Sequence, residues 1–152
     1  MSHGIEAGLE IRGTDIMPPA VWYDIVPSVE IDEVPNRTLF TSLGGHYLPW
    51  LGLEPLVPVR GLPADVTQPL KERYDAWGGA AYDASWVTYE ELVAAVEHMT
   101  TALAHLERHQ DMDAPTLLRL HRGVSIDAVI AFLSVYHSRG FETRLVFWFT
   151  PI

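Results

Sequence analysis

Apolar and polar residues alternate along the first part of the chain. Between Ile5 and Arg12 every second residue is apolar, which is the period of a strand with one buried face. Two short strands are predicted at 21–26 and 29–34, separated by Pro27, because proline cannot donate to a strand ladder. Residues 142–150 are apolar on both faces, which indicates an interior strand at the other end of the sequence.

Helical spacing dominates the second half of the chain. Thr88 and Glu91 form a T-x-x-E capping box, and apolar residues follow in steps of three and four to about Arg108. Ser125 is predicted to begin a second helix, which ends at Gly140. Shorter elements are predicted as helices at 38–43, capped by Asn36, and at 70–77, and as a strand at 117–120.

These elements predict an α+β fold. Residues 1–152 are expected to form a single domain, in which a mixed sheet of about four to six strands carries two longer helices. A chain of 152 residues is long enough to bury a substantial core without disulfides.

Composition restricts the cellular compartments and the kinds of partner that we expect for the protein. The chain has no cysteine, which excludes disulfides and thiolate metal sites and suits a reducing compartment. It shows neither a signal-peptide pattern nor an apolar run of the ~18 residues that a membrane span needs. We therefore expect a cytoplasmic protein with no membrane partner.

Negative charge is concentrated near the N-terminus. The net charge is −10, and residues 1–35 contribute −6 of it through seven carboxylates and Arg12. Such a field repels phosphate backbones, so no direct nucleic-acid binding is expected. An acidic face between Glu6 and Glu33 instead suits contact with a basic protein surface.

Motifs for catalysis, metals and cofactors are missing from the sequence. It has no G-x-S-x-G elbow and no glycine-rich phosphate loop. His105 and His109 have the i,i+4 spacing of two metal ligands, but without an HExxH pattern solvated surface histidines explain them more simply. No catalytic residue, metal or cofactor is therefore predicted, and the missing motifs favour a protein that is not an enzyme over an enzyme whose residues come from distant loops.

A candidate ligand site lies in the middle of the chain. Residues 48–69 contain five prolines among apolar residues, which predicts an ordered irregular segment of the kind that often carries function. Together with the aromatic residues that follow, it supplies six predicted ligand-binding residues: Arg60, Asp65, Trp77, Tyr82, Asp83 and Trp86. Arg60 is expected to hold an anion and Trp86 a planar group. The alternative is that the tryptophans are core residues and that Arg60 pairs with Asp65 to fix the loop.

The chain resembles a family of small, uncharacterised proteins of bacteria and their phages. The resemblance covers most of the chain and rests on segments 8–12, 39–45, 54–66, 85–92 and 144–149, which include RGLPADV, SWVTYEEL and RLVFWF. Members of the family tend to show Asp-Ile-His and His-Ser-His-Ser-Trp where this chain has Gly4-Ile5-Glu6 and Tyr82-Asp83-Ala84-Ser85-Trp86. The resemblance implies that metal or acid–base groups are missing here, which favours a binding role. If a phage encodes the protein, the resemblance also implies that it acts in the host cytoplasm.

Three functions follow from these observations. The first is a phage or bacterial accessory protein that binds a nucleotide-like ligand without catalysis and antagonises host defence signalling; it predicts a concave pocket. The second is an acidic inhibitor that mimics nucleic acid and binds a host protein, which predicts salt-sensitive association. The third is a hydrolase, which predicts turnover. Self-association through Phe147 or Trp148 would give a homo-oligomer, although an interior strand explains both side chains.

Overall fold

A four-stranded antiparallel sheet forms the centre of the computed structural model, which describes residues 3–13, 20–31, 33–49, 52–110 and 124–151. The strands are β1 (His3–Arg12), β2 (Tyr23–Ile31), β3 (Tyr82–Thr88) and β4 (Glu142–Pro151), and they lie in the order β2-β1-β4-β3. All three pairings are antiparallel, so the described strands include no parallel pair. Strands from opposite ends of the chain therefore pair at the centre of the sheet.

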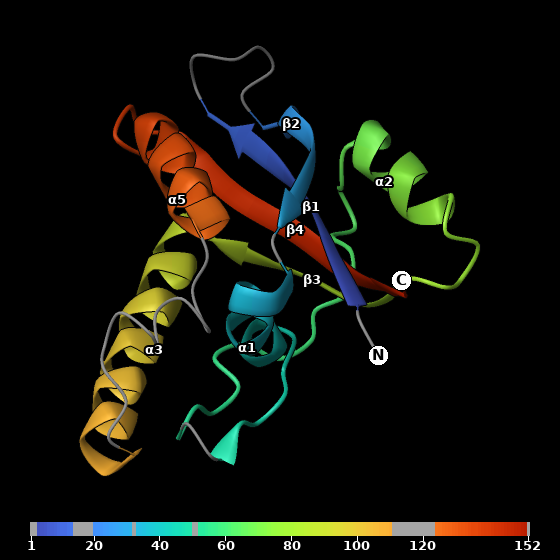
Figure 1. Cartoon of the computed structure of the whole chain (residues 1–152). Coiled ribbons are helices and arrows are strands. Elements are labelled where there is room, and N and C mark those ends of the chain that lie inside the picture. Colours follow the sequence, from blue (N-terminus) through green and yellow to red (C-terminus); the bar gives the residue numbers. More distant parts are fainter. Residues whose placement is uncertain (1–2, 14–19, 32, 50–51, 111–123, 152) are drawn as a thin grey trace.

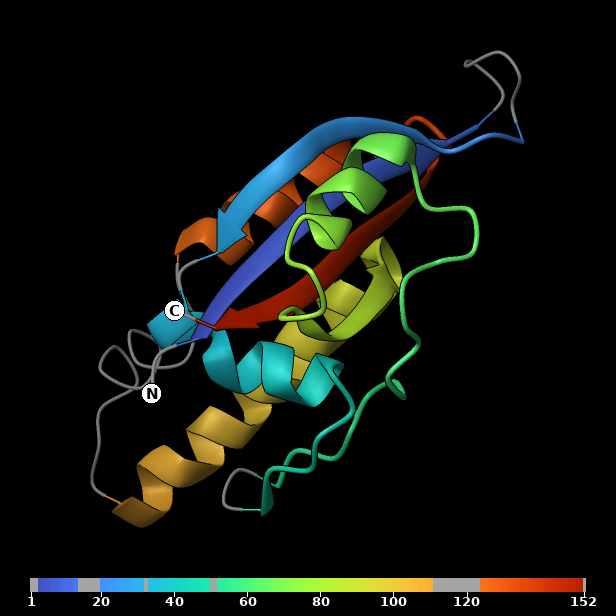
Figure 2. The ribbon, with the colours of Figure 1, turned by 90° about the vertical axis from the view of Figure 1, so that its right-hand side faces the viewer.

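The helices cover the two faces of the sheet unequally (Figures 1 and 2). On one face lie α1 (Glu33–Leu43), α3 (Tyr89–Gln110) and α5 (Val124–His137), and on the other face lies α2 (Gln68–Asp75). The predicted α+β class with two longer helices is confirmed. No described helix is both long and apolar enough to span a bilayer.

The larger core lies beneath the three helices. The alternation predicted for β1 is confirmed, since Ile5, Ala7 and Leu9 are buried in this core. Phe147 of β4 meets Phe40 of α1 edge to face, with ring centroids 5.0 Å apart. Burial of this apolar surface holds the three helices on the sheet.

β4 is buried on both faces, as its sequence predicted. Its residues from Thr143 to Thr150 are all buried, and its neighbours are β1 and β3. Val146 and Trp148 face α2, where they form a smaller core with Leu70. Trp148 and Phe147 have no exposed surface, so self-association through these two side chains is ruled out.

The segment from 21 to 45 differs from its prediction. One strand, β2, runs through Pro27, because β2 is an edge strand whose pairing with β1 is irregular and therefore tolerates a missing donor. Val34 lies in α1, and Asn36 is inside this helix rather than at its cap. The predicted strand at 117–120 lies outside the described residues.

Two glycines, Gly44 and Gly45, follow the last residue of α1. Gly45 has a φ of 87°, which glycine adopts at little cost. The amide of His46 donates to the carbonyl of Thr41 at 3.1 Å, and that of Gly45 donates to Ser42 at 3.2 Å. These two bonds make a Schellman motif that satisfies carbonyls at the end of the helix.

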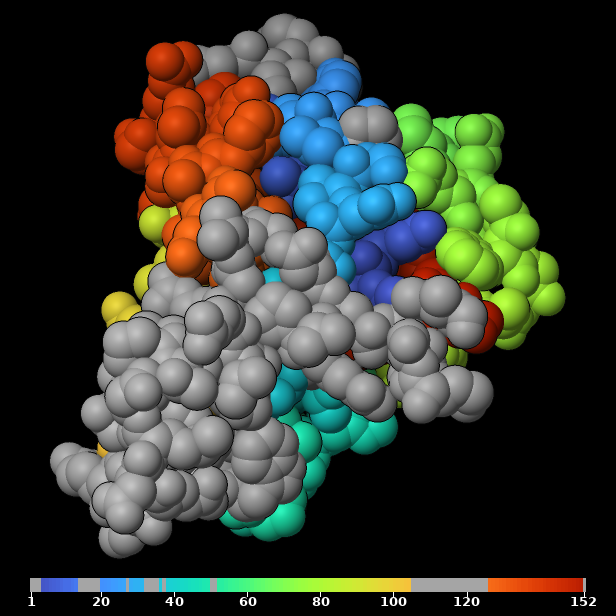
Figure 3. All heavy atoms as spheres, viewed as in Figure 1, coloured from blue at the N-terminus to red at the C-terminus, as the bar shows by residue number. Residues whose placement is uncertain are grey.

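β3 was not predicted as a strand. Its register with β4 shifts between Tyr82 and Ser85, and Asp83 has a φ of 51°, so no regular alternation precedes Trp86. At the opposite edge of the sheet, β2 is exposed between α5 and α2 (Figure 3).

Candidate functional site

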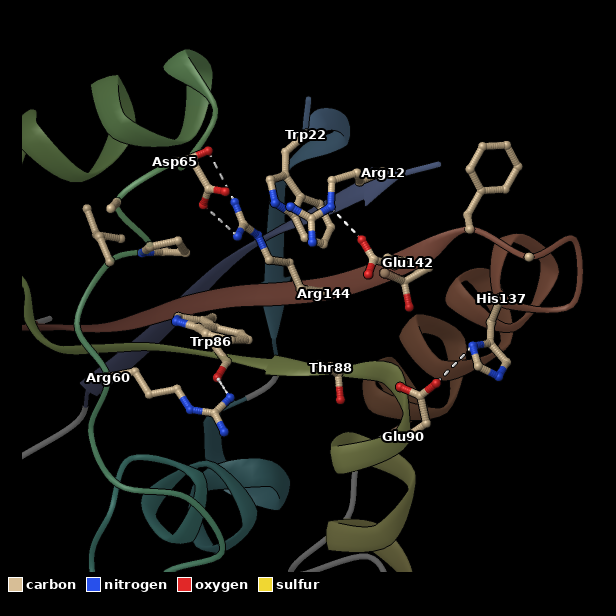
Figure 4. A pocket seen from close by; sticks show the side chains of 16 residues that line it. Arg12, Trp22, Arg60, Asp65, Trp86, Thr88, Glu90, His137, Glu142 and Arg144 are labelled. Atoms are coloured by element: carbon tan, nitrogen blue, oxygen red, sulfur yellow. Dashed lines mark hydrogen bonds and ion pairs between the residues drawn. The ribbon is translucent and has the colours of Figure 1, made fainter. Parts of the chain in front are cut away.

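A cavity of about 860 Å³ lies beside α2, at the end of the sheet where β1 and β3 end and β4 begins. α2 reaches the sheet over Gly8, where an added Cβ would lie 2.5 Å from Leu70. The strand ends beyond that contact form the floor of the cavity, and the loop at 60–65 forms one wall. Figure 4 shows the side chains that line it.

The floor is built on a buried ion pair. Glu10 of β1 lies directly opposite Arg144 of β4, and Nε of Arg144 donates to Glu10 Oε1 at 2.6 Å. Their side chains are 0% and 4% exposed. The amide of Thr67 donates to the second oxygen of Glu10 at 2.7 Å. Buried charges are tolerated when they are both paired and hydrogen-bonded, as they are here.

Arg144 also fixes the loop that forms one wall. Its Nη1 donates to Asp65 Oδ1 at 2.9 Å, and its Nη2 donates to the carbonyl of Asp65 at 3.3 Å. Burial raises the pKa of Asp65, but the hydrogen bond and the charge of Arg144 together lower it by a larger amount. The pKa of Asp65 therefore lies below its ordinary value. Asp65 is therefore ionised at neutral pH.

A second ion pair holds the loop against β3 and α3. Both terminal nitrogens of Arg60 donate to Glu91, at 2.9 and 2.6 Å, and Nη1 also donates to the carbonyl of Trp86 at 3.0 Å. The guanidinium carbon lies 4.3 Å from the centre of the Trp86 ring. The hydrogen bonds from Arg60 keep the pKa of Glu91 below its ordinary value, although burial opposes them.

Trp22 brings a second indole to the cavity. The guanidinium carbons of Arg144 and Arg12 lie 3.9 and 4.5 Å from the centre of its ring, within the range of cation–π contacts. Arg12 also pairs with Glu142, its neighbour across the β1–β4 ladder. Residues far apart in the sequence thus meet at one edge of the cavity.

The opposite side of the cavity comes from the ends of two helices (Figure 4). Nδ1 of His137, the last residue of α5, lies 3.3 Å from a carboxylate oxygen of Glu90 in the first turn of α3. The His137 ring also packs on Tyr89, with 4.4 Å between centroids. The Glu90 and His137 side chains are 66% and 40% exposed, so this pair is open to solvent.

The structure brings three of the six predicted site residues together. Arg60, Asp65 and Trp86 line the cavity. The proposed pairing of Arg60 with Asp65 is wrong, because each binds a different partner, Glu91 and Arg144. The loop at 60–65 therefore has an ion pair at each end, Arg60 with Glu91 and Asp65 with Arg144.

Trp77, Tyr82 and Asp83 do not line this cavity. Nε1 of Trp77 donates to Glu6 at 3.2 Å on the far side of α2, and Tyr82 stacks on Phe149 at 5.7 Å. Oδ2 of Asp83 lies 3.0 Å from Nε2 of His46, within hydrogen-bond distance. The irregular start of β3 turns these side chains away from the strand ends.

Sequence reasoning missed Arg12, Trp22 and Arg144. The polar positions of β1 carried a signal, because the alternation that buries Leu9 and Ile11 places Glu10 and Arg12 together on the other face. An arginine inside an otherwise apolar strand was a second signal, since such a residue requires a buried partner.

Metal ligands do not gather anywhere in the described residues in a group of three or more. His105 and His109 lie in α3, but their side chains are outside the described part of the structure. Comparison of the chain with protein-family models, curated proteins and solved structures gives no match.

Proposed function

We propose that this protein binds a small planar ligand without catalysis. The observation that carries the proposal is the cavity, whose volume of about 860 Å³ falls in the range of small-molecule sites. Two indoles, Trp22 and Trp86, border it, and tryptophan offers a large flat surface on which rings stack. A nucleobase or a related heterocycle is of suitable size and shape.

The two carboxylates that hold the loop at 60–65, Asp65 and Glu91, favour binding over chemistry. A general acid or base works best with a pKa near the operating pH. Asp65 and Glu91 instead have lowered pKa values, and each is held by an arginine. Such carboxylates fix the shape of the site and do not exchange protons at neutral pH.

The alternative function, an acidic inhibitor that binds a host protein, receives less support from the positions of the N-terminal carboxylates. Glu10 is fully buried against Arg144, and Glu6 is 21% exposed beside Arg73, at 3.7 Å, and Trp77. Two carboxylates of the acidic N-terminal third are therefore unavailable to a basic partner. An accessory role against host defence remains a prediction that rests on the resemblance.

A thermal-shift screen tests the proposal. Purified protein is heated with a panel of nucleobases, nucleosides, nucleotides and cyclic nucleotides, because a ligand at 100 times its Kd adds about 2.7 kcal/mol to stability. We expect a ligand-specific shift that Trp86→Leu abolishes. Trp77→Leu is the matched control, since Trp77 lies outside the cavity, and it should keep the shift.

Two outcomes contradict the proposal. If no compound raises the melting temperature, the cavity does not bind this class of ligand. If a compound binds and chromatography recovers it chemically altered, the protein is an enzyme, and the hydrolase alternative replaces the binder.

A further inference from the structure

The three arginines that line the cavity are all engaged by carboxylates. Arg12 pairs with Glu142, Arg60 binds Glu91 through two nitrogens, and Arg144 binds both Glu10 and Asp65. The expected role of Arg60 as an anion holder therefore requires it to leave Glu91 and the carbonyl of Trp86. A phosphate cannot take over Arg144 either without stranding a buried Glu10, which is costly.

The charge around the cavity is also unfavourable for an anion. Three arginines line the cavity. Five carboxylates pair with these arginines or line the cavity themselves: Glu10, Asp65, Glu90, Glu91 and Glu142. With His137 neutral, this cluster carries a net charge of −2, and the whole chain carries −10. The more exposed members of the cluster are carboxylates, since Asp65, Glu142 and Glu90 are 58, 60 and 66% exposed.

We propose that the cavity selects uncharged planar ligands, of the nucleobase or nucleoside class, over their phosphorylated forms. The inference rests on the proposed function and narrows its ligand. The rings provide stacking surface, while the exposed carboxylates repel a phosphate and accept hydrogen bonds from the N–H groups of a heterocycle.

Arg12 is the guanidinium that a phosphate would reach with least disruption. Its side chain is 33% exposed, more than those of Arg60 (23%) and Arg144 (4%), and its partner Glu142 is 60% exposed. Exposed pairs contribute little to stability. Glu142 therefore acts as a specificity-determining residue, because it occupies the arginine most accessible to an anion.

Calorimetric titration of matched nucleosides and 5′-monophosphates tests the inference. Adenosine, guanosine, cytidine and uridine are each compared with their monophosphate at one salt concentration. For each base that binds, the nucleoside is expected to bind at least about tenfold more tightly than the monophosphate. A monophosphate that binds as tightly as its nucleoside, or more tightly, overturns the inference while leaving the proposed function intact. If no nucleobase, nucleoside or nucleotide binds, the proposed function itself fails, and the inference fails with it.

The variant Glu142→Gln tests the residue assigned to specificity. It frees Arg12, so the ratio of the affinity for the monophosphate to the affinity for the nucleoside should rise about tenfold. Glu97→Gln is the control, because it changes the net charge equally at an exposed position away from this cavity, and it should leave both affinities unchanged. Equal effects of the two variants would contradict the assignment.

Discussion

Glu91 has two structural roles at once. Its amide donates to the Thr88 hydroxyl oxygen at 3.2 Å, and its carboxylate accepts a hydrogen bond from the Thr88 amide at 3.0 Å, as in a capping box. The same carboxylate holds both terminal nitrogens of Arg60. One side chain therefore caps α3 and fixes the loop beside the cavity.

Substitution Glu91→Gln should lower the free energy of unfolding at pH 7 by about 2 kcal/mol, because a partly buried, charge-assisted pair is lost. Urea denaturation measures the change. Glu90→Gln is the matched control, since Glu90 is exposed, and it should change stability by no more than about 0.5 kcal/mol. Equal stability of the wild type and Glu91→Gln would contradict the role assigned to this side chain.

The same side chain predicts a dependence on pH. The pKa of Glu91 is lower in the folded protein than its ordinary value of 4.5. Its stabilisation is therefore complete above about pH 5 and is lost as the pH falls through the lowered folded pKa. Between neutral pH and about pH 3, unfolding free energies should fall less steeply in Glu91→Gln than in the wild type. Parallel curves would show that Glu91 is not linked to folding.

Arg144 is expected to be the most sensitive residue of the floor. Arg144→Met should lower the free energy of unfolding by about 3–5 kcal/mol, because it leaves the buried carboxylate of Glu10 without an opposite charge. The double substitution Glu10→Met with Arg144→Met removes both charges and should recover most of that loss. Chemical denaturation of the single and double variants measures both values. A double variant that is less stable than Arg144→Met would contradict the unpaired charge as the cause.

For single residues, the sequence indicated which residue types belong to the site, but it did not indicate which side chains they bind. The aromatic and arginine content at Arg60 and Trp86 indicated a site, and both residues line the cavity. The partners of Arg60 and Asp65 were missed because Glu91 and Arg144 lie 31 and 79 residues away in the chain. Only the fold decides which of several carboxylates reaches a given guanidinium.

At the scale of elements, α2 depends on a close approach to the sheet. Gly8→Ala places a Cβ about 2.5 Å from Leu70, so either α2 or β1 must shift. We expect a loss of about 1–3 kcal/mol in the free energy of unfolding, as is usual for overpacking. In a Leu70→Ala background the same substitution should cost clearly less, because the clashing side chain is gone. Additive effects in this double-mutant cycle would contradict the contact.

An uninterrupted period gave the most complete predictions of elements. β1, β4 and α3 each show regular spacing, and their predicted bounds agree with the structure to within a few residues. β3 was missed because its bulge at 82–85 breaks the alternation. Pro27 divided β2 in the prediction, although an edge strand tolerates proline.

At the scale of the whole molecule, the site depends on the pairing of β1 with β4. These strands come from opposite ends of the chain, and their ladder places Glu10 beside Arg144 and Arg12 beside Glu142. The loop at 60–65 and the end of β3 then close the cavity around them. Periodicity predicts the fold class, but it cannot give the strand order, and the strand order assembles this site.

The most direct test is a ¹H–¹⁵N spectrum of the tryptophan indole N–H groups, recorded while the tightest-binding nucleoside is added to saturation. Single Trp→Phe variants assign the signals. Binding in the cavity predicts shifts for Trp22 and Trp86, which line it, and unchanged signals for Trp77 and Trp148, which do not. Shifts confined to Trp77 or Trp148, or no shift at saturation, would contradict a ligand site at the end of the sheet.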